Sequence, residues 1–317
     1  MKKKNHFDYI ICGGGASGLL LAFRICNDPF FANKSILLIE KDHKFSNDRT
    51  WCFWESKEGD LEEIIHKSWD QSFFASKDFH LDFNLSPYKY KMIRSLDFYK
   101  FIQQHFRKFN QLTQVKDEVI KIESNKVTTL ASEYNTDFIF SSILDPKKLL
   151  QQKKYPVLQQ HFIGQIIETK NNCFDPDRIE FMNFDIPQKG NTRFMYVLPL
   201  SKNKALLEYT LFSEDLLARQ EYVDEITAFA NQIPTGGYKV IEEEQGNIPM
   251  TCFRFDISNT ENILQIGTAG GWTKPSTGYT FQRINNKTKA LVEFLKLNLP
   301  LKKFGQKNRF WFYDLLF

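Results

Sequence analysis

The stretch that decides the fold lies near the N-terminus and reads DYIICGGGASG, from Asp8 to Gly18. Its first five residues predict a short buried strand, and residues 16–27, which are apolar on one face, predict a helix. Between the two, Gly13, Gly15 and Gly18 fit the pattern Gly-x-Gly-x-x-Gly at a strand-to-helix turn. That is the context that a dinucleotide-binding loop needs, so the sequence predicts an α/β fold that begins with a Rossmann-type βαβ unit.

Each residue of this loop has a separate predicted role. Gly13 permits the tight turn, and Gly15 lets the backbone approach a pyrophosphate at the positive end of the helix that begins at Ala16. Gly18 allows the helix to pack closely on the strand. Glu40 ends the next predicted strand, where a carboxylate binds ribose hydroxyls and disfavours the 2′-phosphate of NADP. The βαβ unit alone does not separate FAD from NAD.

A second glycine-rich loop favours FAD. The string GTAGG, residues 267–271, follows a predicted strand and precedes the string PSTGY, residues 275–279, and a predicted helix over 279–298. A late loop of this kind suits the flavin end of an extended FAD, because backbone amides and the helix dipole can face the isoalloxazine ring. A plain loop is the alternative. The predicted contacts to the cofactor in this region are Gly267, Ala269, Gly270, Pro275 and Gly278.

Composition and charge exclude several classes of protein. The chain has 317 residues, 42% of them hydrophobic, which suggests two domains or one large α/β unit with an insertion. A net charge of only +4 gives no electrostatic case for nucleic-acid binding. Five cysteines without a CxxC pair or clustered histidines argue against a metal site, and their odd number favours a reducing compartment. No apolar run reaches the roughly 18–20 residues of a membrane-spanning helix, so any membrane contact is expected to be peripheral.

The middle of the chain changes character. Alternating apolar runs in 160–184 and 192–212 predict antiparallel strands, followed by a helix over 214–232 and a strand over 238–249. We therefore expect an FAD-binding domain formed by residues 1–75, 95–158 and 258–317. The expected substrate domain is an inserted antiparallel β-sheet formed by residues 76–94 and 159–257. Residues 47–54 are predicted to form a loop. Residues 310–317 end inside an apolar pattern without a cap, which suggests a truncated C-terminus.

Several strings, taken in order along the chain, resemble the flavin-dependent lycopene cyclases of bacteria and plants. They are residues 8–18, Glu40, 48–51, 92–95, 160–162, 196–200, 205–210, 246–250 and 267–279. The resemblance implies a fold like that of aromatic hydroxylases and geranylgeranyl reductases, and a family that continues past Phe317. It also implies conversion of the linear ends of lycopene into β-rings, through γ-carotene to β-carotene, without net redox change. The implied cofactor is reduced FAD, with NADPH as the electron source. Ring type and the number of rings formed are left open.

The resemblance assigns a catalytic residue. The string Leu206–Thr210 matches a family motif with an essential acid, and Glu208 occupies the acid's place. Plant members carry a second acid next to it, whereas this chain has Tyr209, which argues against paired carboxylates at this site. Strand alternation puts Leu206, Glu208 and Thr210 on one face. Glu208 is then a proton donor, a cation stabiliser or a final base. A reduced flavin as direct donor and a solvent-facing strand residue are the alternatives.

The remaining candidates are less specific. Arg49 is predicted to contact the pyrophosphate or the flavin, with a surface arginine as the alternative. Asp145, which precedes Pro146, is either a cofactor contact or a helix N-cap. Residues 303–313 are basic and aromatic, and either touch a membrane or begin a core helix. Since lycopene resides in the bilayer, the resemblance implies a cytoplasmic protein that is peripheral on the inner face of the membrane.

Two other functions compete with the cyclase. One is an FAD-dependent oxidoreductase of the monooxygenase or prenyl-reductase type that acts on an apolar isoprenoid. Such enzymes resemble this chain but typically carry an Asp in the late loop, where Thr268 stands here, so the sequence favours the cyclase. The other is a carotenoid or flavin carrier without catalytic activity. A glutamate on a strand face that can be buried argues against a carrier.

Overall fold

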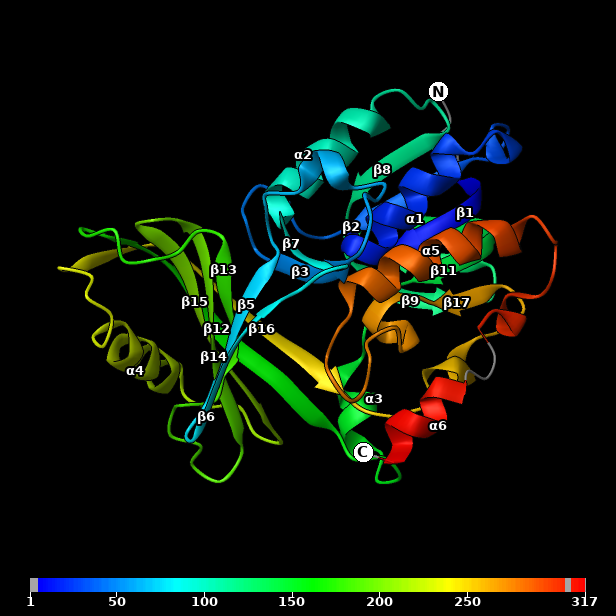
Figure 1. Ribbon diagram of the computed structural model, residues 1–317. Helices are drawn as coiled ribbons and strands as arrows, with labels where there is room; N and C mark the ends of the chain where they lie inside the picture. Colours follow the sequence, from blue (N-terminus) through cyan, green and yellow to red (C-terminus); the bar gives the residue numbers. More distant parts are fainter. Residues whose placement is uncertain (1–4, 306–308, 317) are drawn as a thin grey trace. The chain divides into compact units, whose positions relative to one another are not determined.

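The structure, a computed structural model, describes residues 5–305 and 309–316 and divides into two compact units. Unit 1 comprises the chain up to Phe45, Tyr99–Val157 and the chain from Met250 onward. Unit 2 comprises Ser46–Phe98 and Leu158–Pro249. Each unit therefore collects segments that are far apart in the sequence, as the colours of Figure 1 show.

Unit 1 is built on a mainly parallel sheet, which has seven strands among the described residues. Its order is β8-β2-β1-β11-β10-β9, and β17 pairs with β11. Strands β8, β2, β1, β11 and β17 run parallel, whereas β9, β10 and β11 form an antiparallel meander. The strand bounds are β1 His6–Cys12, β2 Ile36–Glu40, β8 Leu112–Lys116, β9 Val119–Glu123, β10 Lys126–Thr129, β11 Glu133–Ser141 and β17 Ile263–Gln265.

Helices cover one face of this sheet. Helix α1 spans Ala16–Asn27, as predicted, and buries the run Leu19–Leu21. Helix α5, Phe281–Leu295, packs beside α1, and Arg24 of α1 donates hydrogen bonds to Asn285 and Thr288 of α5. The opposite face carries an apolar cluster that includes Ile10, Leu37, Val127 and Ile139. The other helices of the chain are α2 Ser95–Phe106, α3 Pro146–Gln151, α4 Arg219–Ala230 and α6 Arg309–Leu316.

Unit 2 contains a second sheet, again of seven strands in the described part of the chain, in the order β16-β12-β15-β14-β13-β5-β6. A three-stranded sheet, β3-β7-β4, accompanies it. The strand bounds are β3 Thr50–Glu55, β4 Lys67–Trp69, β5 Gln71–Ser76, β6 Phe79–Asn84, β7 Lys89–Arg94, β12 Leu158–Thr169, β13 Arg178–Asn183, β14 Thr192–Ser201, β15 Lys204–Ser213 and β16 Tyr238–Met250.

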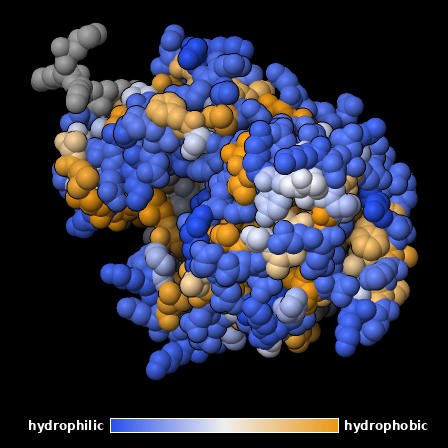
Figure 2. All heavy atoms as spheres, turned by 90° about the vertical axis from the view of Figure 1, so that its left-hand side faces the viewer, coloured by the Kyte–Doolittle hydropathy of each residue, from blue (hydrophilic) through white to orange (hydrophobic). Residues whose placement is uncertain are grey.

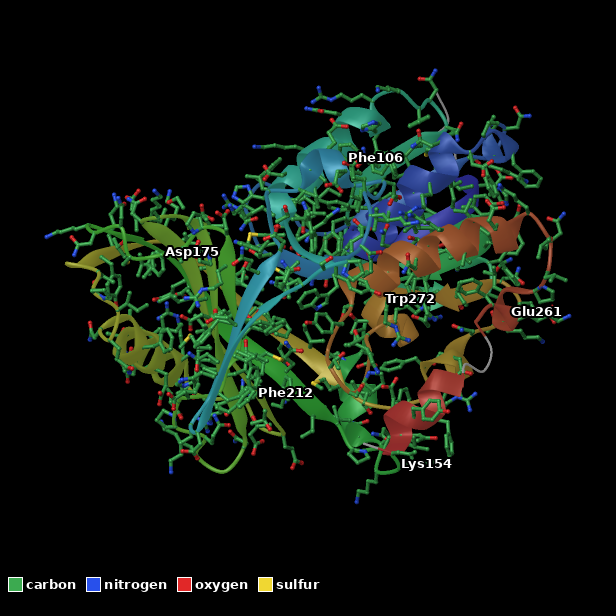
Figure 3. The ribbon with its side chains drawn as sticks, viewed as in Figure 1. Phe106, Lys154, Asp175, Phe212, Glu261 and Trp272 are labelled. Carbon is green, nitrogen blue, oxygen red and sulfur yellow. The ribbon has the colours of Figure 1, made fainter. Side chains whose placement is uncertain are left out.

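The two faces of the large sheet in unit 2 have different coverings. On one face, Tyr209 and Leu211 of β15 pack with Tyr222 and Ile226 of α4. The opposite face forms the aromatic cluster, which contains Trp69, Tyr90, Phe194, Tyr196, Leu206 and, at its margin, Phe212 (Figure 3). Because side chains alternate along a strand, Glu208 shares the aromatic cluster's face with Leu206.

The loop predicted for residues 47–54 was wrong from Thr50 onward. These residues were expected to form a loop, but Thr50–Glu55 form β3, which pairs antiparallel with β7. The partner strand is remote in the sequence, so local pattern does not reveal the pairing. Together with β4 and β5, this pairing places residues 46–75 in unit 2 rather than in the predicted FAD-binding domain, and the later boundary falls at Met250 rather than at residue 258.

One face of the molecule is mostly polar. Figure 2 shows a face covered largely by hydrophilic side chains, with small apolar areas between them. Among the described residues, no helix is both long and apolar enough to cross a membrane. The described part of the chain also contains no group of three or more His, Cys, Asp or Glu side chains arranged to hold a metal ion.

Candidate functional site

The first glycine loop has the geometry of a dinucleotide-binding turn. Gly13 has a φ of +101°, and a Cβ there would lie 2.2 Å from Ser142 Oγ. A Cβ on Gly18 would lie 2.0 Å from the carbonyl oxygen of Gly13. At Gly15 a Cβ would meet nothing within 4 Å, and α1 begins at the next residue, Ala16, without a side-chain cap. Open space at the amino end of a helix is what an approaching pyrophosphate requires.

Glu40 lies against this loop. It ends β2, and its carboxylate accepts hydrogen bonds from the backbone N–H groups of Gly14 and, at 2.9 Å, of Asp42. The predicted ribose-binding carboxylate therefore reaches the turn where the adenosine end of a dinucleotide is expected. A cofactor hydroxyl at this position would exchange with one of these backbone donors.

The second glycine loop lies beside the first. Gly267 begins the short 3₁₀ helix η4, Gly267–Gly270, with a φ of +62°, and a Cβ there would lie 2.5 Å from Ser17 Oγ. Gly270 approaches the backbone of Gln265 equally closely. The predicted contact Gly278, with a φ of +71°, closes the loop after Pro275 by donating to Lys274 O. The structure thus brings together two loops from opposite ends of the chain.

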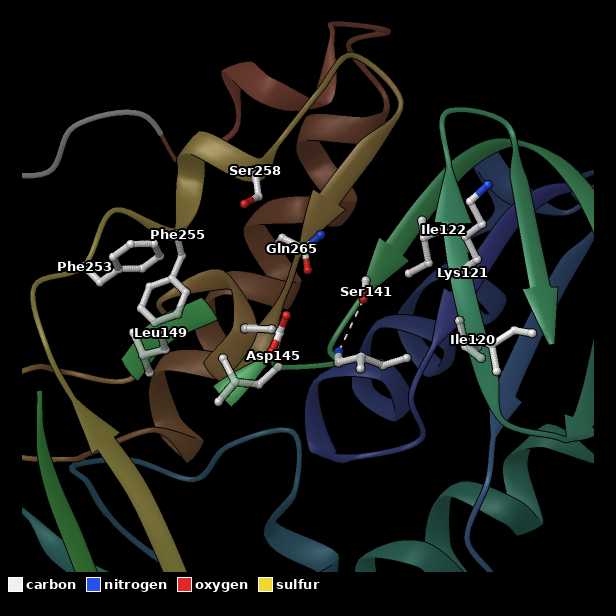
Figure 4. Close-up of a pocket in the computed structure, with 14 residues that line it drawn as sticks. Ile120, Lys121, Ile122, Ser141, Asp145, Leu149, Phe253, Phe255, Ser258 and Gln265 are labelled. Atoms are coloured by element: carbon white, nitrogen blue, oxygen red, sulfur yellow. Dashed lines mark hydrogen bonds between the residues drawn. The ribbon is translucent and has the colours of Figure 1, made fainter. Parts of the chain in front are cut away.

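Two cavities adjoin the second loop in unit 1. A cavity of about 430 Å³ is lined by Asp145 and Phe255, which Figure 4 labels, and by Ile143 and Ala269, among others. Another, of about 330 Å³, includes Gly270 and Pro275 in its lining. Asp145 lies in the first cavity, but its carboxylate accepts a hydrogen bond from Lys147 N at 3.0 Å, as an N-cap of α3 does. Asp145 therefore has the geometry of the N-cap alternative.

In unit 2, Glu208 occupies the middle of β15. In the sheet it lies opposite Gly164 of β12 on one side and Tyr196 of β14 on the other. Thr210 donates a hydrogen bond of 2.8 Å to its Oε1 atom. Burial raises the pKa of Glu208 to about 8, the charge of Glu244 acts in the same direction, and the Thr210 hydrogen bond acts against both. A carboxyl group with this pKa is largely protonated at neutral pH.

A second carboxyl group, which the sequence analysis did not identify, lies near Glu208. Glu244 of β16 accepts a hydrogen bond of 2.7 Å from Thr50 Oγ1, and its Oε1 atom is buried without a hydrogen-bond partner among the described residues. Burial raises the pKa of Glu244, against the effects of Thr50, Arg49 and Arg94. Tyr209 argues only against a second carboxylate that follows Glu208 directly in the sequence. The second carboxyl group found here comes from another strand.

Arg49 belongs to unit 2. Its guanidinium donates to Asp48 O at 2.7 Å and to Gln245 O at 3.2 Å, and its backbone N–H donates to Ser95 Oγ. Its charge lowers the pKa of Glu244. The expected contact between Arg49 and a cofactor stays a prediction.

The fold is shared by a class of flavin-dependent enzymes. A geranylgeranyl bacteriochlorophyll reductase-like protein from Thermoplasma acidophilum superposes with a TM-score of 0.66 at 14% identity, over 98% of this chain and 82% of that one. A probable FAD-dependent monooxygenase from Pseudomonas aeruginosa superposes with a TM-score of 0.64 at 13% identity, over 92% of this chain and 86% of that one. The fold is therefore that of the FAD-dependent monooxygenases and related reductases.

Within this class of fold, the chain belongs to the lycopene cyclase protein family, whose model matches residues 8–311. It is 24% identical to lycopene beta-cyclase of Pantoea ananas, over 87% of this chain and 71% of that protein. It is 26% identical to the capsanthin/capsorubin synthase of Capsicum annuum, over 87% of this chain. The chain spans 58% of the length of that plant relative.

Proposed function

We propose that this chain is a lycopene beta-cyclase, an intramolecular lyase that closes the linear ends of lycopene into β-rings. The observation that carries the proposal is Glu208. It occupies the acid's position in a family motif, and burial raises its pKa to about 8, so it is available as a proton donor at neutral pH. The similarity to the protein named lycopene beta-cyclase from Pantoea ananas supports the same assignment.

In the proposed reaction, the Glu208 carboxyl group gives its proton to C2 of the terminal C1–C2 double bond, which leaves a tertiary cation at C1. The electrons of the C5–C6 double bond then form the C6–C1 bond, and the charge moves to C5. Loss of the proton from C6 to the Glu208 carboxylate completes a β-ring and restores the acid. Product and substrate have the same atoms and the same oxidation state.

The surroundings of Glu208 suit this chemistry. A carbocation survives only where water is excluded, and charged groups act more strongly in such a site. Tyr196, Phe194 and Leu206 are buried on the same face of the sheet as Glu208 and keep that face apolar. An apolar setting both raises the pKa of the acid and admits a hydrocarbon substrate.

We propose FAD as the cofactor, held through Gly13, Gly15, Ala16, Gly18 and Glu40 at its ADP end and through the loop of Gly267, Ala269 and Gly270 at its flavin end. The tight Gly13–Gly18 contact, the open space at Gly15 and the adjacent second loop fit such a ligand. When bound and reduced, with NADPH as the electron source, FAD would supply negative charge that can stabilise a cation. Loss of flavin absorbance on adding NADPH without oxygen would check the electron source.

The test is expression of the chain in cells that accumulate lycopene, with Glu208→Gln as the control. We expect γ-carotene and then β-carotene from the unchanged chain, and a loss of about 10²- to 10⁴-fold in rate with Glu208→Gln. Retention time and absorption spectrum report the number and type of rings. Recovery of only oxidised or reduced polyenes would instead support the oxidoreductase alternative that the fold neighbours suggest, and full activity of Glu208→Gln would remove Glu208 from the reaction.

We further propose that the protein works in the cytoplasm, at the inner face of the membrane. Lycopene is a hydrocarbon that partitions into the bilayer, so an enzyme acting on it must reach the bilayer surface. Helix α6 exposes Phe312, Leu315 and Leu316, which lie in or next to the basic and aromatic segment 303–313, for which membrane contact and the start of a core helix were the two alternatives. Part of that segment, residues 306–308, lies outside the described residues.

A further inference from the structure

Two carboxyl groups of unit 2 face one another across a glycine. Strand β12 lies between β15 and β16 in the sheet, and Gly164 of β12 is opposite Glu208 of β15. A Cβ on Gly164 would lie 3.5 Å from Glu208 Cβ, 3.4 Å from Glu244 Cγ and 3.0 Å from Leu206 Cδ1. Strands two positions apart in a sheet are separated by about 10 Å, and a side chain on the middle strand normally fills that space. Here the middle residue has no side chain, so Glu208, Glu244 and Leu206 all reach the space above Gly164.

The two carboxyl groups are supported unequally. Glu244 accepts a hydrogen bond from Thr50, and two cationic side chains, Arg49 and Arg94, act on it. Glu208 accepts a hydrogen bond from Thr210, and no cationic side chain among the described residues acts on its carboxyl group. A negative charge is therefore more stable on Glu244, and a proton is more stable on Glu208.

The other titratable groups around the pair do not reverse this order. Cys52 of β3 lies near both carboxyl groups, which together with burial raise the pKa of its thiol, so it stays neutral. Tyr90 of β7 donates to Cys52, and Tyr196 of β14 lies opposite Glu208. Glu242 of β16 also acts on Glu244, but its charge is paired with Arg94.

We propose that Glu244 is a positioning residue that forms one proton-sharing unit with Glu208, in which Glu244 carries the charge and Glu208 carries the proton. This inference rests on the proposed function of Glu208 and adds a partner to it. The charge on Glu244 keeps Glu208 protonated before the reaction. After Glu208 has given up its proton, the same charge favours the return of a proton to Glu208 from C6 of the ring. Such a pair titrates as a unit rather than as two independent acids.

The experiment compares Glu244→Gln with Glu243→Gln in the full chain. Both substitutions remove one carboxylate from β16, but Glu243 lies on the opposite face, where it accepts hydrogen bonds from Gln165 at 2.9 Å and Arg219 at 2.5 Å. The first readout is the infrared band of protonated carboxyl groups, recorded against pH and assigned to Glu208 by its loss in Glu208→Gln. We expect Glu244→Gln to move the titration of this band down by about one pH unit or more, and Glu243→Gln to leave it in place.

The second readout is the pH profile of cyclisation. With Glu244→Gln we expect near-normal activity at pH 6 and a loss of about fivefold or more at pH 8, because kcat falls as Glu208 loses its proton. An unmoved infrared titration in Glu244→Gln would overturn the proton-sharing unit, whatever the activity. If the unchanged chain fails to cyclise lycopene while the band still moves, the pair stands and the proposed reaction fails. Glu244→Asp, which keeps the charge, should restore the unchanged chain's pH profile in part.

Discussion

The glycines of the first loop differ in the atoms that an added side chain would contact. This difference distinguishes a glycine required for folding from one required for ligand binding. Gly18 has no room for a side chain, because the Gly13 carbonyl oxygen lies where its Cβ would be. Gly15 has open space and ordinary backbone angles, with φ of −76°. The sequence pattern correctly predicted the tight turn at Gly13 and the close packing at Gly18, because a glycine motif encodes backbone geometry directly, whereas the pyrophosphate contact at Gly15 stays a prediction. It could not predict Glu244, whose role depends on a third strand.

At the scale of single residues, we expect Gly15→Ala to impair FAD binding and Gly18→Ala to impair folding. Gly18→Ala forces the helix away from the strand and should lower the stability of the FAD-free chain by about 1–3 kcal/mol. Gly15→Ala should leave that stability within about 0.5 kcal/mol and weaken FAD binding, because the methyl group occupies the predicted pyrophosphate space. Urea unfolding and flavin titration measure the two effects. Equal FAD affinity in Gly15→Ala and the unchanged chain would contradict the predicted site.

Strand β15 shows how far an element can be read from sequence. Its alternation correctly placed Leu206 and Glu208 on one face and Tyr209 on the other, because side chains alternate along any strand. Helix α1 likewise has the bounds that its apolar face predicted. Strand β3 was missed, because its residues Thr50–Glu55 become a strand only through pairing with β7. A local sequence pattern predicts the secondary structure of one segment, but not the remote segment with which it pairs.

The elevated pKa of Glu208 makes the stability of unit 2 depend on pH. The ordinary pKa of a glutamate, 4.5, applies in the unfolded chain, whereas the folded value is about 8. The folded state then holds the proton more tightly, so this contribution to stability is fully present below about pH 4.5 and is lost as the pH rises through 8. We expect the difference in unfolding free energy between the unchanged chain and Glu208→Gln to fall by roughly 2–4 kcal/mol from pH 5 to pH 9.

Urea unfolding at a series of pH values measures this slope. The matched control is Glu243→Gln, because the pKa of Glu243 is lowered and its contribution changes in the opposite sense. A stability difference between the unchanged chain and Glu208→Gln that does not change with pH would mean that Glu208 is charged in the folded protein.

At the scale of the whole molecule, the division into two units was anticipated but its boundaries were not. The change to alternating strands near residue 159 predicted a new domain there, and unit 2 resumes at Leu158. The role of unit 2 as a substrate domain stays a prediction. The first crossing was expected after residue 75, yet unit 2 begins at Ser46, because β3, β4 and β5 pair with later strands. A sequence pattern reveals a change from a parallel to an antiparallel sheet only after several residues have alternated between apolar and polar.

The proposed membrane contact is also a property of the whole molecule, and flotation with lipid vesicles tests it. We expect the chain to float with zwitterionic vesicles and to remain bound in high salt, since apolar contact is not screened as charge is. Phe312→Ser with Leu316→Ser should reduce the bound fraction several-fold. Leu130→Ser, which removes an equally exposed side chain elsewhere in unit 1, is the control and should change nothing. A chain that never floats would contradict the contact.

The assembly of each unit from separate segments has a consequence for how the protein is made. Unit 2 is complete once Pro249 has been synthesised, whereas α1 of unit 1 packs beside α5, which begins at Phe281. At about 5–20 residues per second, roughly ten to fifty seconds pass between the synthesis of these two helices. During that interval helix α1 lacks its neighbour α5. Unit 1, which starts first and finishes last, is therefore the part of the nascent chain that most needs protection from aggregation.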